Sequence, residues 1–65
     1  MPIVTIALIE GRTKEQKARI VEEITDTLVR VAKVKPESVH IVISDHPKEN
    51  LAKGGKLLSD LSEFP

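Results

Sequence analysis

The sequence predicts an α/β fold: a βαβ subunit that ends in a short C-terminal hairpin. Three features point to it, namely two short runs rich in β-branched residues, a long amphipathic segment between them, and a Gly-Gly pair near the C-terminus. Strands that are joined through a helix run parallel, and the crossover between them is right-handed in nearly all proteins. We therefore expect a two-stranded parallel sheet that is completed by dimerisation.

The first strand is predicted over residues 3–9, IVTIALI. Alternate residues of a strand point to opposite faces, and here both faces are apolar. A strand with two apolar faces needs cover on both of them. One helix of the same chain covers only one face, so the other face requires a second subunit.

A helix is predicted over about residues 14–33. Gly11 ends the strand, and Thr13 followed three residues later by Gln16 matches a capping box. The residues that recur at the helical period form one apolar stripe. They are Ile20, Val21, Ile24, Leu28, Val31 and Ala32.

The second strand is predicted over residues 38–44, SVHIVIS, and the segment 45–47, Asp-His-Pro, is interpreted as a turn. Gly54-Gly55 indicates a hairpin within residues 48–58. The 65 residues form a single domain, with a core over 1–58 and an irregular tail over 59–65. A domain this short buries only about 60% of its unfolded surface, and without cysteine its remedy is oligomerisation.

The composition excludes several classes of partner. Ten basic and ten acidic residues cancel, and Phe64 is the only aromatic residue, so neither nucleic acid nor an anionic membrane is expected as a partner. No apolar run approaches the ~18 residues of a membrane span. No basic leader precedes an apolar stretch, so we expect no signal peptide and a cytoplasmic location.

Pro2 directly follows the initiator methionine. Aminopeptidases remove the initiator when the second residue is small, and proline qualifies. The mature chain then begins with a secondary amine, which could act as a general base near neutral pH because α-amino groups titrate near pH ~8. The alternative is that Pro2 only starts an edge strand, where proline is tolerated.

Arg12 lies at the other end of the first strand, and ten residues at ~3.3 Å each separate it from Pro2 by roughly 33 Å. If the two act together, the site lies between subunits whose first strands run antiparallel. A guanidinium suits a carboxylate, whereas a surface arginine beside a helix N-terminus is mildly unfavourable. His40 is either a partly buried strand histidine or a substrate contact. His40 and His46, roughly 20 Å apart on an extended chain, form no metal site, and no cofactor is expected.

Several short motifs occur together in this chain, and they are Pro2, Glu10-Gly11-Arg12, Glu15-Gln16-Lys17, Ser38-Val39 and Gly54-Gly55. With these residues the chain resembles the 4-oxalocrotonate tautomerase family from Pro2 to about Leu58. The resemblance implies small βαβ subunits that pair into dimers and assemble as a homohexamer, a trimer of dimers.

The resemblance also implies roles for individual residues. Pro2 corresponds to the catalytic base and Arg12 to a carboxylate-binding arginine. His40 stands where the family's type enzyme has a second arginine, and Leu51 where it has a phenylalanine, so both are expected at the substrate. The implied reaction moves a proton in an unsaturated 2-hydroxy or 2-oxo carboxylic acid similar to 2-hydroxymuconate.

Two alternatives remain open. Pro2, when protonated, could act as an acid in hydration or dehalogenation of an unsaturated acid, as in relatives of this family. The chain could also be a non-catalytic oligomeric relative. If Met1 is retained, the Pro2 nitrogen is an amide and cannot be a base.

Overall fold

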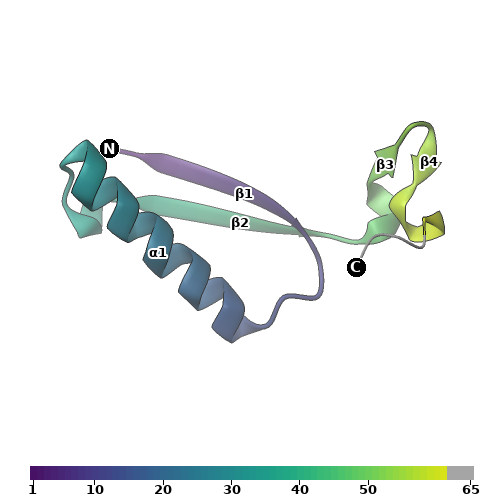
Figure 1. Ribbon diagram of the computed structural model, residues 1–65, viewed down its shortest axis with the longest axis horizontal. Coiled ribbons are helices and arrows are strands. Elements are labelled where there is room, and N and C mark those ends of the chain that lie inside the picture. Colours follow the sequence, from purple (N-terminus) through teal and green to yellow (C-terminus); the bar gives the residue numbers. More distant parts are fainter. Residues whose placement is uncertain (62–65) are drawn as a thin grey trace.

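The chain runs through a strand, a long helix and a second strand, and then forms a small hairpin. The computed structural model describes residues 1–61. Its elements are β1 (Ile3–Ile9), α1 (Lys14–Ala32), η1 (Pro36–Ser38), β2 (His40–His46), η2 (Lys48–Asn50), β3 (Ala52–Lys53), β4 (Lys56–Leu57) and η3 (Leu58–Asp60), where η marks a 3-10 helix. β1 and β2 form a two-stranded parallel sheet, and α1 lies along one face of it (Figure 1). The predicted βαβ unit is confirmed.

The start of α1 is fixed by the predicted capping box. The Thr13 hydroxyl accepts a hydrogen bond from the Gln16 backbone N–H at 3.1 Å, and the Gln16 side-chain oxygen accepts one from the Thr13 N–H at 2.9 Å. These two bonds satisfy donors that the first helical turn leaves without partners. The helix ends at Ala32 because Lys33 turns into the left-handed conformation, with φ at 60°.

The second strand lies two residues later than predicted. Every residue of β1 pairs with one of β2, from Ile3 with His40 to Ile9 with His46. The interpretation of Asp45 and His46 as a turn is therefore wrong, because pairing with the end of β1 keeps both residues in the strand. Ser38 belongs instead to η1, where its backbone N–H donates to the Lys35 carbonyl at 3.0 Å.

The two faces of the sheet differ in how well they are covered. On the face toward α1, the side chains are half-buried; they are Val4, Ile6, Leu8, Ile41 and Ile43. On the opposite face Ile3 is 68% exposed and Val42 is 51% exposed. A single chain therefore leaves one apolar sheet face open, as the two-faced first strand predicted.

The apolar stripe of α1 is correct at its start and wrong at its end. Val31 is 70% exposed and Ala32 is also exposed, whereas Thr25 and Val29 are half-buried. In Figure 1 the last turn of α1 lies past the first residues of both strands. The final two residues of the predicted stripe therefore have no sheet beneath them.

The C-terminal hairpin is confirmed. β3 and β4 pair antiparallel around a two-residue turn at Gly54 and Gly55, whose φ angles of 60° and 83° are those that favour glycine in such a turn. Leu58, the one buried residue among 1–61, donates its backbone N–H to the Leu51 carbonyl at 2.8 Å. The predicted irregular tail begins inside η3, and its last four residues, 62–65, lie outside the described residues.

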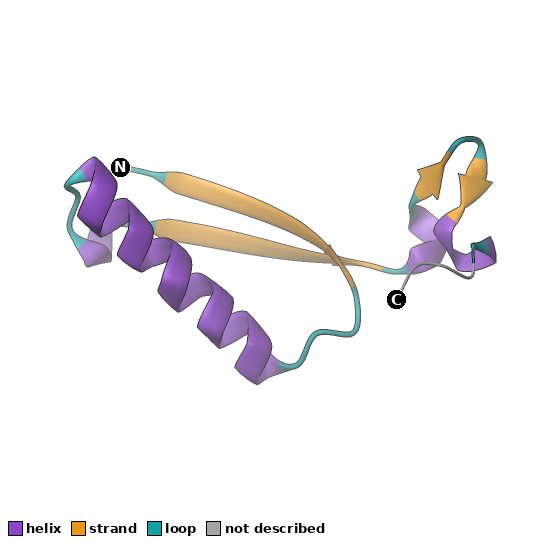
Figure 2. Ribbon diagram, viewed as in Figure 1, coloured by secondary structure: helices purple, strands orange, loops and turns teal. Residues whose placement is uncertain are grey.

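The hairpin stands away from the sheet, at the far end of β2 (Figure 2). The chain measures 42 × 23 × 15 Å, and its radius of gyration of 14.9 Å exceeds the ~11 Å expected for a domain of this length. Its accessible surface of 5032 Å² also exceeds the ~4100 Å² of a monomer of this mass. The fold of one chain thus exposes surface that a self-contained domain would bury. No helix within residues 1–61 is long and apolar enough to cross a membrane.

Candidate active site

Pro2 and His40 lie together at one end of the sheet. The Pro2 carbonyl accepts a hydrogen bond from the His40 backbone N–H at 3.0 Å, which places them on adjacent strands. Pro2 is half-buried, whereas Met1 before it is 83% exposed and open to an aminopeptidase. The His40 side chain is exposed and makes no hydrogen bond or ion pair within residues 1–61.

Arg12 lies at the opposite end of the sheet, in the loop between β1 and α1. Gly11, with φ at 121°, turns the chain there, and the Glu10 backbone N–H donates to the His46 carbonyl at 2.9 Å. The Arg12 side chain is exposed and has no ion-pair partner in the described part of the chain. The whole length of β1 therefore separates Arg12 from Pro2 within one subunit, as predicted.

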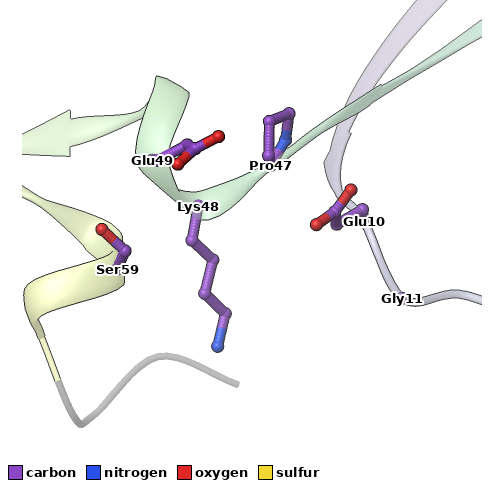
Figure 3. A pocket seen from close by; sticks show the side chains of 6 residues that line it. All are labelled: Glu10, Gly11, Pro47, Lys48, Glu49 and Ser59. Carbon is purple, nitrogen blue, oxygen red and sulfur yellow. The ribbon is translucent and has the colours of Figure 1, made fainter.

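An open depression of about 650 Å³ reaches Gly11, the residue before Arg12. Three segments line it: the end of β1, the segment that follows β2, and η3 (Figure 3). Its lining residues are Glu10, Gly11, Pro47, Lys48, Glu49 and Ser59. Two carboxylates and one ammonium group therefore surround it. Leu51, which was expected at the substrate, is half-buried at the base of the hairpin and does not line the depression.

Sequence reasoning missed Lys48, Glu49 and Ser59 as lining residues. Ser59 reaches the depression only because the hairpin turns the chain back at Gly54 and Gly55. The Gly-Gly pair indicated that the segments on either side of it approach each other. No spacing in the sequence indicated which of their residues would face Gly11.

An ion pair positions the start of α1 beside this end of the sheet. The Lys17 ammonium in α1 contacts the Asp45 carboxylate in β2, and both side chains are partly exposed. A pair so accessible to water contributes no more than about 1 kcal/mol. The ion pair matters to the site because it holds α1 against the sheet close to the loop that carries Arg12.

The residues suited to metal binding are dispersed. His40 and His46 occupy opposite ends of β2. Among residues 1–61 no three histidine or carboxylate side chains gather in a group that could hold a metal ion. The Pro2 end therefore carries the imidazole of His40, and the Arg12 end carries a guanidinium, two carboxylates and an ammonium group.

The fold and the two ends of the sheet can now be compared with those of known proteins. A family model described as tautomerase enzyme matches residues 2–61. The chain belongs to this tautomerase family, and its resemblance to the 4-oxalocrotonate tautomerases is confirmed.

Individual relatives cover almost the whole chain. A probable tautomerase of Halalkalibacterium halodurans, BH3814, is 38% identical over 60 residues, which are 92% of this chain and 98% of that protein. The crystal structure of YwhB, a homologue of 4-oxalocrotonate tautomerase, superposes with a TM-score of 0.87 at 37% identity, over 92% of this chain and 98% of that one. A heterohexamer 4-oxalocrotonate tautomerase from Chloroflexus aurantiacus superposes with a TM-score of 0.87 at 26% identity, over 94% and 98%.

Proposed function

We propose that the protein is a cofactor-independent tautomerase whose general base is the amino-terminal nitrogen of Pro2 after removal of Met1. Its substrate is an unsaturated 2-hydroxy or 2-oxo carboxylic acid of the 2-hydroxymuconate kind. The observation that carries the proposal is a proline directly behind an exposed initiator in a chain of the tautomerase family. The secondary amine of an N-terminal proline can act as a base. The strand that follows Pro2 fixes the orientation of the proline ring that carries this amine.

The site is proposed to lie between two subunits. Among the described residues, β1 pairs on one edge only, with β2. Its other edge is therefore open to pairing with a second copy of the chain. If two copies of β1 pair antiparallel, Pro2 and His40 of one subunit approach Arg12 and the depression of the other. Closed two-fold pairing repeats this arrangement and gives two equivalent sites per dimer.

The reaction is a proton relay within one substrate molecule. The neutral Pro2 amine removes the proton of the 2-hydroxyl group, and the electron pair forms the carbonyl while the conjugated double bonds shift. The protonated amine then returns the proton to a carbon of the same conjugated system. Arg12 of the other subunit holds the carboxylate, and His40 donates a hydrogen bond to the oxygen on which charge develops.

Substitution of the base tests this proposal directly. We expect Pro2→Ala, shown by mass to lack Met1, to lower kcat/KM for ketonisation of 2-hydroxymuconate by about 10²- to 10⁴-fold, the usual contribution of a positioned base. Absorbance at the wavelength of the dienol follows the reaction. Full activity in a correctly processed and assembled Pro2→Ala protein would rule out Pro2 as the base.

The rate as a function of pH separates the base from the acid alternative. A general base acts as the neutral amine, so kcat/KM rises as the amine loses its proton. A general acid for hydration or dehalogenation acts as the charged amine, so kcat/KM falls over the same interval. Absence of turnover of any unsaturated acid by processed protein would favour the non-catalytic alternative.

A further inference from the structure

We propose that this site selects acids with a single carboxylate: unsaturated 2-hydroxy or 2-oxo monocarboxylic acids whose far end carries no charge. The inference rests on the proposed function, because it joins the Pro2 end of one subunit to the Arg12 end of another. It follows from the fixed charges that the two ends contribute.

Beside Pro2, on the face of the sheet that α1 leaves open, the described residues contribute a histidine and no guanidinium. Arg30, the guanidinium at this end of the chain, lies in the last turn of α1, which covers the other face. His40 is the residue whose backbone N–H bonds to Pro2, and its side chain is exposed and without a partner in residues 1–61. An imidazole donates a hydrogen bond in its neutral form, but it carries a positive charge only when protonated, whereas a guanidinium is always charged. His40 can therefore orient a neutral oxygen without supplying a permanent counterion for an anion.

The Arg12 end offers one carboxylate site and disfavours a second. Arg12 has no ion-pair partner in the described chain, so its two parallel donors are available to one carboxylate. The adjoining depression carries the carboxylates of Glu10 and Glu49 and the ammonium of Lys48. The carboxylates of Glu10 and Glu49 belong to the same lining. In Figure 3 the Lys48 side chain runs between Ser59 and Glu10. With Arg12 engaged, the three charged residues that line the depression sum to minus one.

Other cations near the Pro2 end do not replace a guanidinium. Lys33 and Lys35 lie in the connection from α1 to β2, which Figure 1 shows at the same end as the N-terminus. These two lysines and Arg30 are exposed, and exposed Glu37 follows Lys35. Solvated charges of both signs screen one another, so they add little at a substrate held beside Pro2 and His40.

Substrate charge then decides selectivity. A monocarboxylate is matched by Arg12, and its uncharged end meets His40 beside Pro2. A dicarboxylate leaves its second anion without a fixed counterion and near two carboxylates. Because the dicarboxylate lacks one charge-assisted hydrogen bond, its kcat/KM is lower by about ten- to hundredfold.

A matched pair of substrates tests the inference: 2-hydroxymuconate and 2-hydroxypenta-2,4-dienoate, which differ by the terminal carboxylate. We expect the processed protein to have the higher kcat/KM for the monocarboxylate. We expect His40→Arg to raise the ratio of dicarboxylate to monocarboxylate kcat/KM by about ten- to hundredfold, because it supplies a permanent charge beside Pro2. Glu49→Gln, which removes one repelling charge at the solvated rim, should raise the same ratio by about threefold.

Two controls separate charge at the site from other effects. His40→Gln keeps a hydrogen-bond donor without a charge and should leave the ratio low. Ala18→Arg adds the same guanidinium on the exposed surface of α1 and should leave the ratio unchanged. A wild-type preference for the dicarboxylate, or a ratio that His40→Arg does not move, overturns the inference and leaves the proposed function intact. If neither acid shows turnover that depends on Pro2, the proposed function fails and the inference fails with it.

Discussion

Arg12 combines two properties that distinguish it from the other arginines of the chain. It follows directly on the glycine that ends β1, and its side chain has no ion-pair partner in the described residues, whereas Arg19 is bonded to Glu23 on the surface of α1. The Glu23 carboxylate raises the pKa of the Arg19 guanidinium above its usual value. Arg19 is thus already engaged, and Arg12 is the guanidinium available to a ligand at that end of the sheet.

Removal of the Arg12 guanidinium should weaken substrate binding more than it affects the fold. We expect Arg12→Ala to raise KM by about tenfold to a hundredfold, because a charged hydrogen-bonding partner of the carboxylate is lost. Arg12→Lys should recover part of this loss, since a single ammonium keeps the charge without the paired donors. Arg30→Ala, an exposed arginine on α1, is the matched control and should leave KM unchanged. Equal values of KM for Arg12→Ala and the wild type would exclude Arg12 from the site.

The positions of Pro2 and Arg12 at the two ends of the first strand could be predicted from the sequence. Contacts between residues that are far apart in the sequence could not. Pro2 follows the initiator and Arg12 follows a strand-ending glycine, and both relations are local in sequence. Glu49 and Ser59 meet at one depression only after the hairpin has folded back. Leu51 lies at the base of the hairpin and outside this depression within one chain, so its expected contact with the substrate stays a prediction.

At the scale of elements, α1 depends on its first turn. The reciprocal bonds between Thr13 and Gln16 fix the start of the helix and, with it, the loop that carries Arg12. The ion pair between Lys17 and Asp45 acts at the same end. The helix is therefore tethered most firmly close to the candidate site.

Loss of the cap should cost measurable stability. We expect Thr13→Ala to lower the free energy of unfolding by about 1 kcal/mol, because the Gln16 N–H loses its acceptor. Thr27→Ala is the matched control: its hydroxyl donates to the Glu23 carbonyl at 3.1 Å within the helix, and alanine favours helix, so stability should not fall. Denaturant unfolding monitored by circular dichroism, at one protein concentration, compares the two. An equal loss in both variants would show that the cap contributes nothing specific.

The two ends of β2 show why the boundaries of a strand are harder to predict from the sequence than its presence. Asp45 and His46 are polar and precede a proline, which is typical of a turn, yet pairing with Leu8 and Ile9 keeps them in β2. That pairing is a long-range relation which local sequence does not contain. The length of the partner strand, and not the local composition, decided where β2 ends.

At the scale of the whole molecule, one chain leaves a face of its sheet open and holds its hairpin away from that sheet. Ile3 and Val42 are more than half exposed on the face that α1 leaves uncovered. The radius of gyration of 14.9 Å belongs to a chain with its hairpin extended away from its sheet. We propose that copies of the chain cover this face and assemble as a homohexamer, a trimer of dimers.

A charge on the open face should separate the copies. We expect Val42→Asp to shift the protein from its oligomer to smaller species in sedimentation velocity, because a carboxylate buried at an apolar interface without a partner costs several kcal/mol. Ala18→Asp, which adds the same charge on the exposed surface of α1, should leave the sedimentation coefficient unchanged. An unaltered oligomer in Val42→Asp would mean that this face is not the interface.

The separation of Pro2 from Arg12 by the length of β1 has a consequence for mixtures of defective chains. A Pro2→Ala chain retains Arg12, and an Arg12→Ala chain retains Pro2, so a site built across two subunits is intact when it takes one functional residue from each. After equimolar unfolding and refolding together, random pairing restores activity to about one quarter of the wild-type value. At a substrate concentration below the wild-type KM, each variant refolded alone keeps only the low rate of its own defect, and a site confined to one chain would show no recovery on mixing.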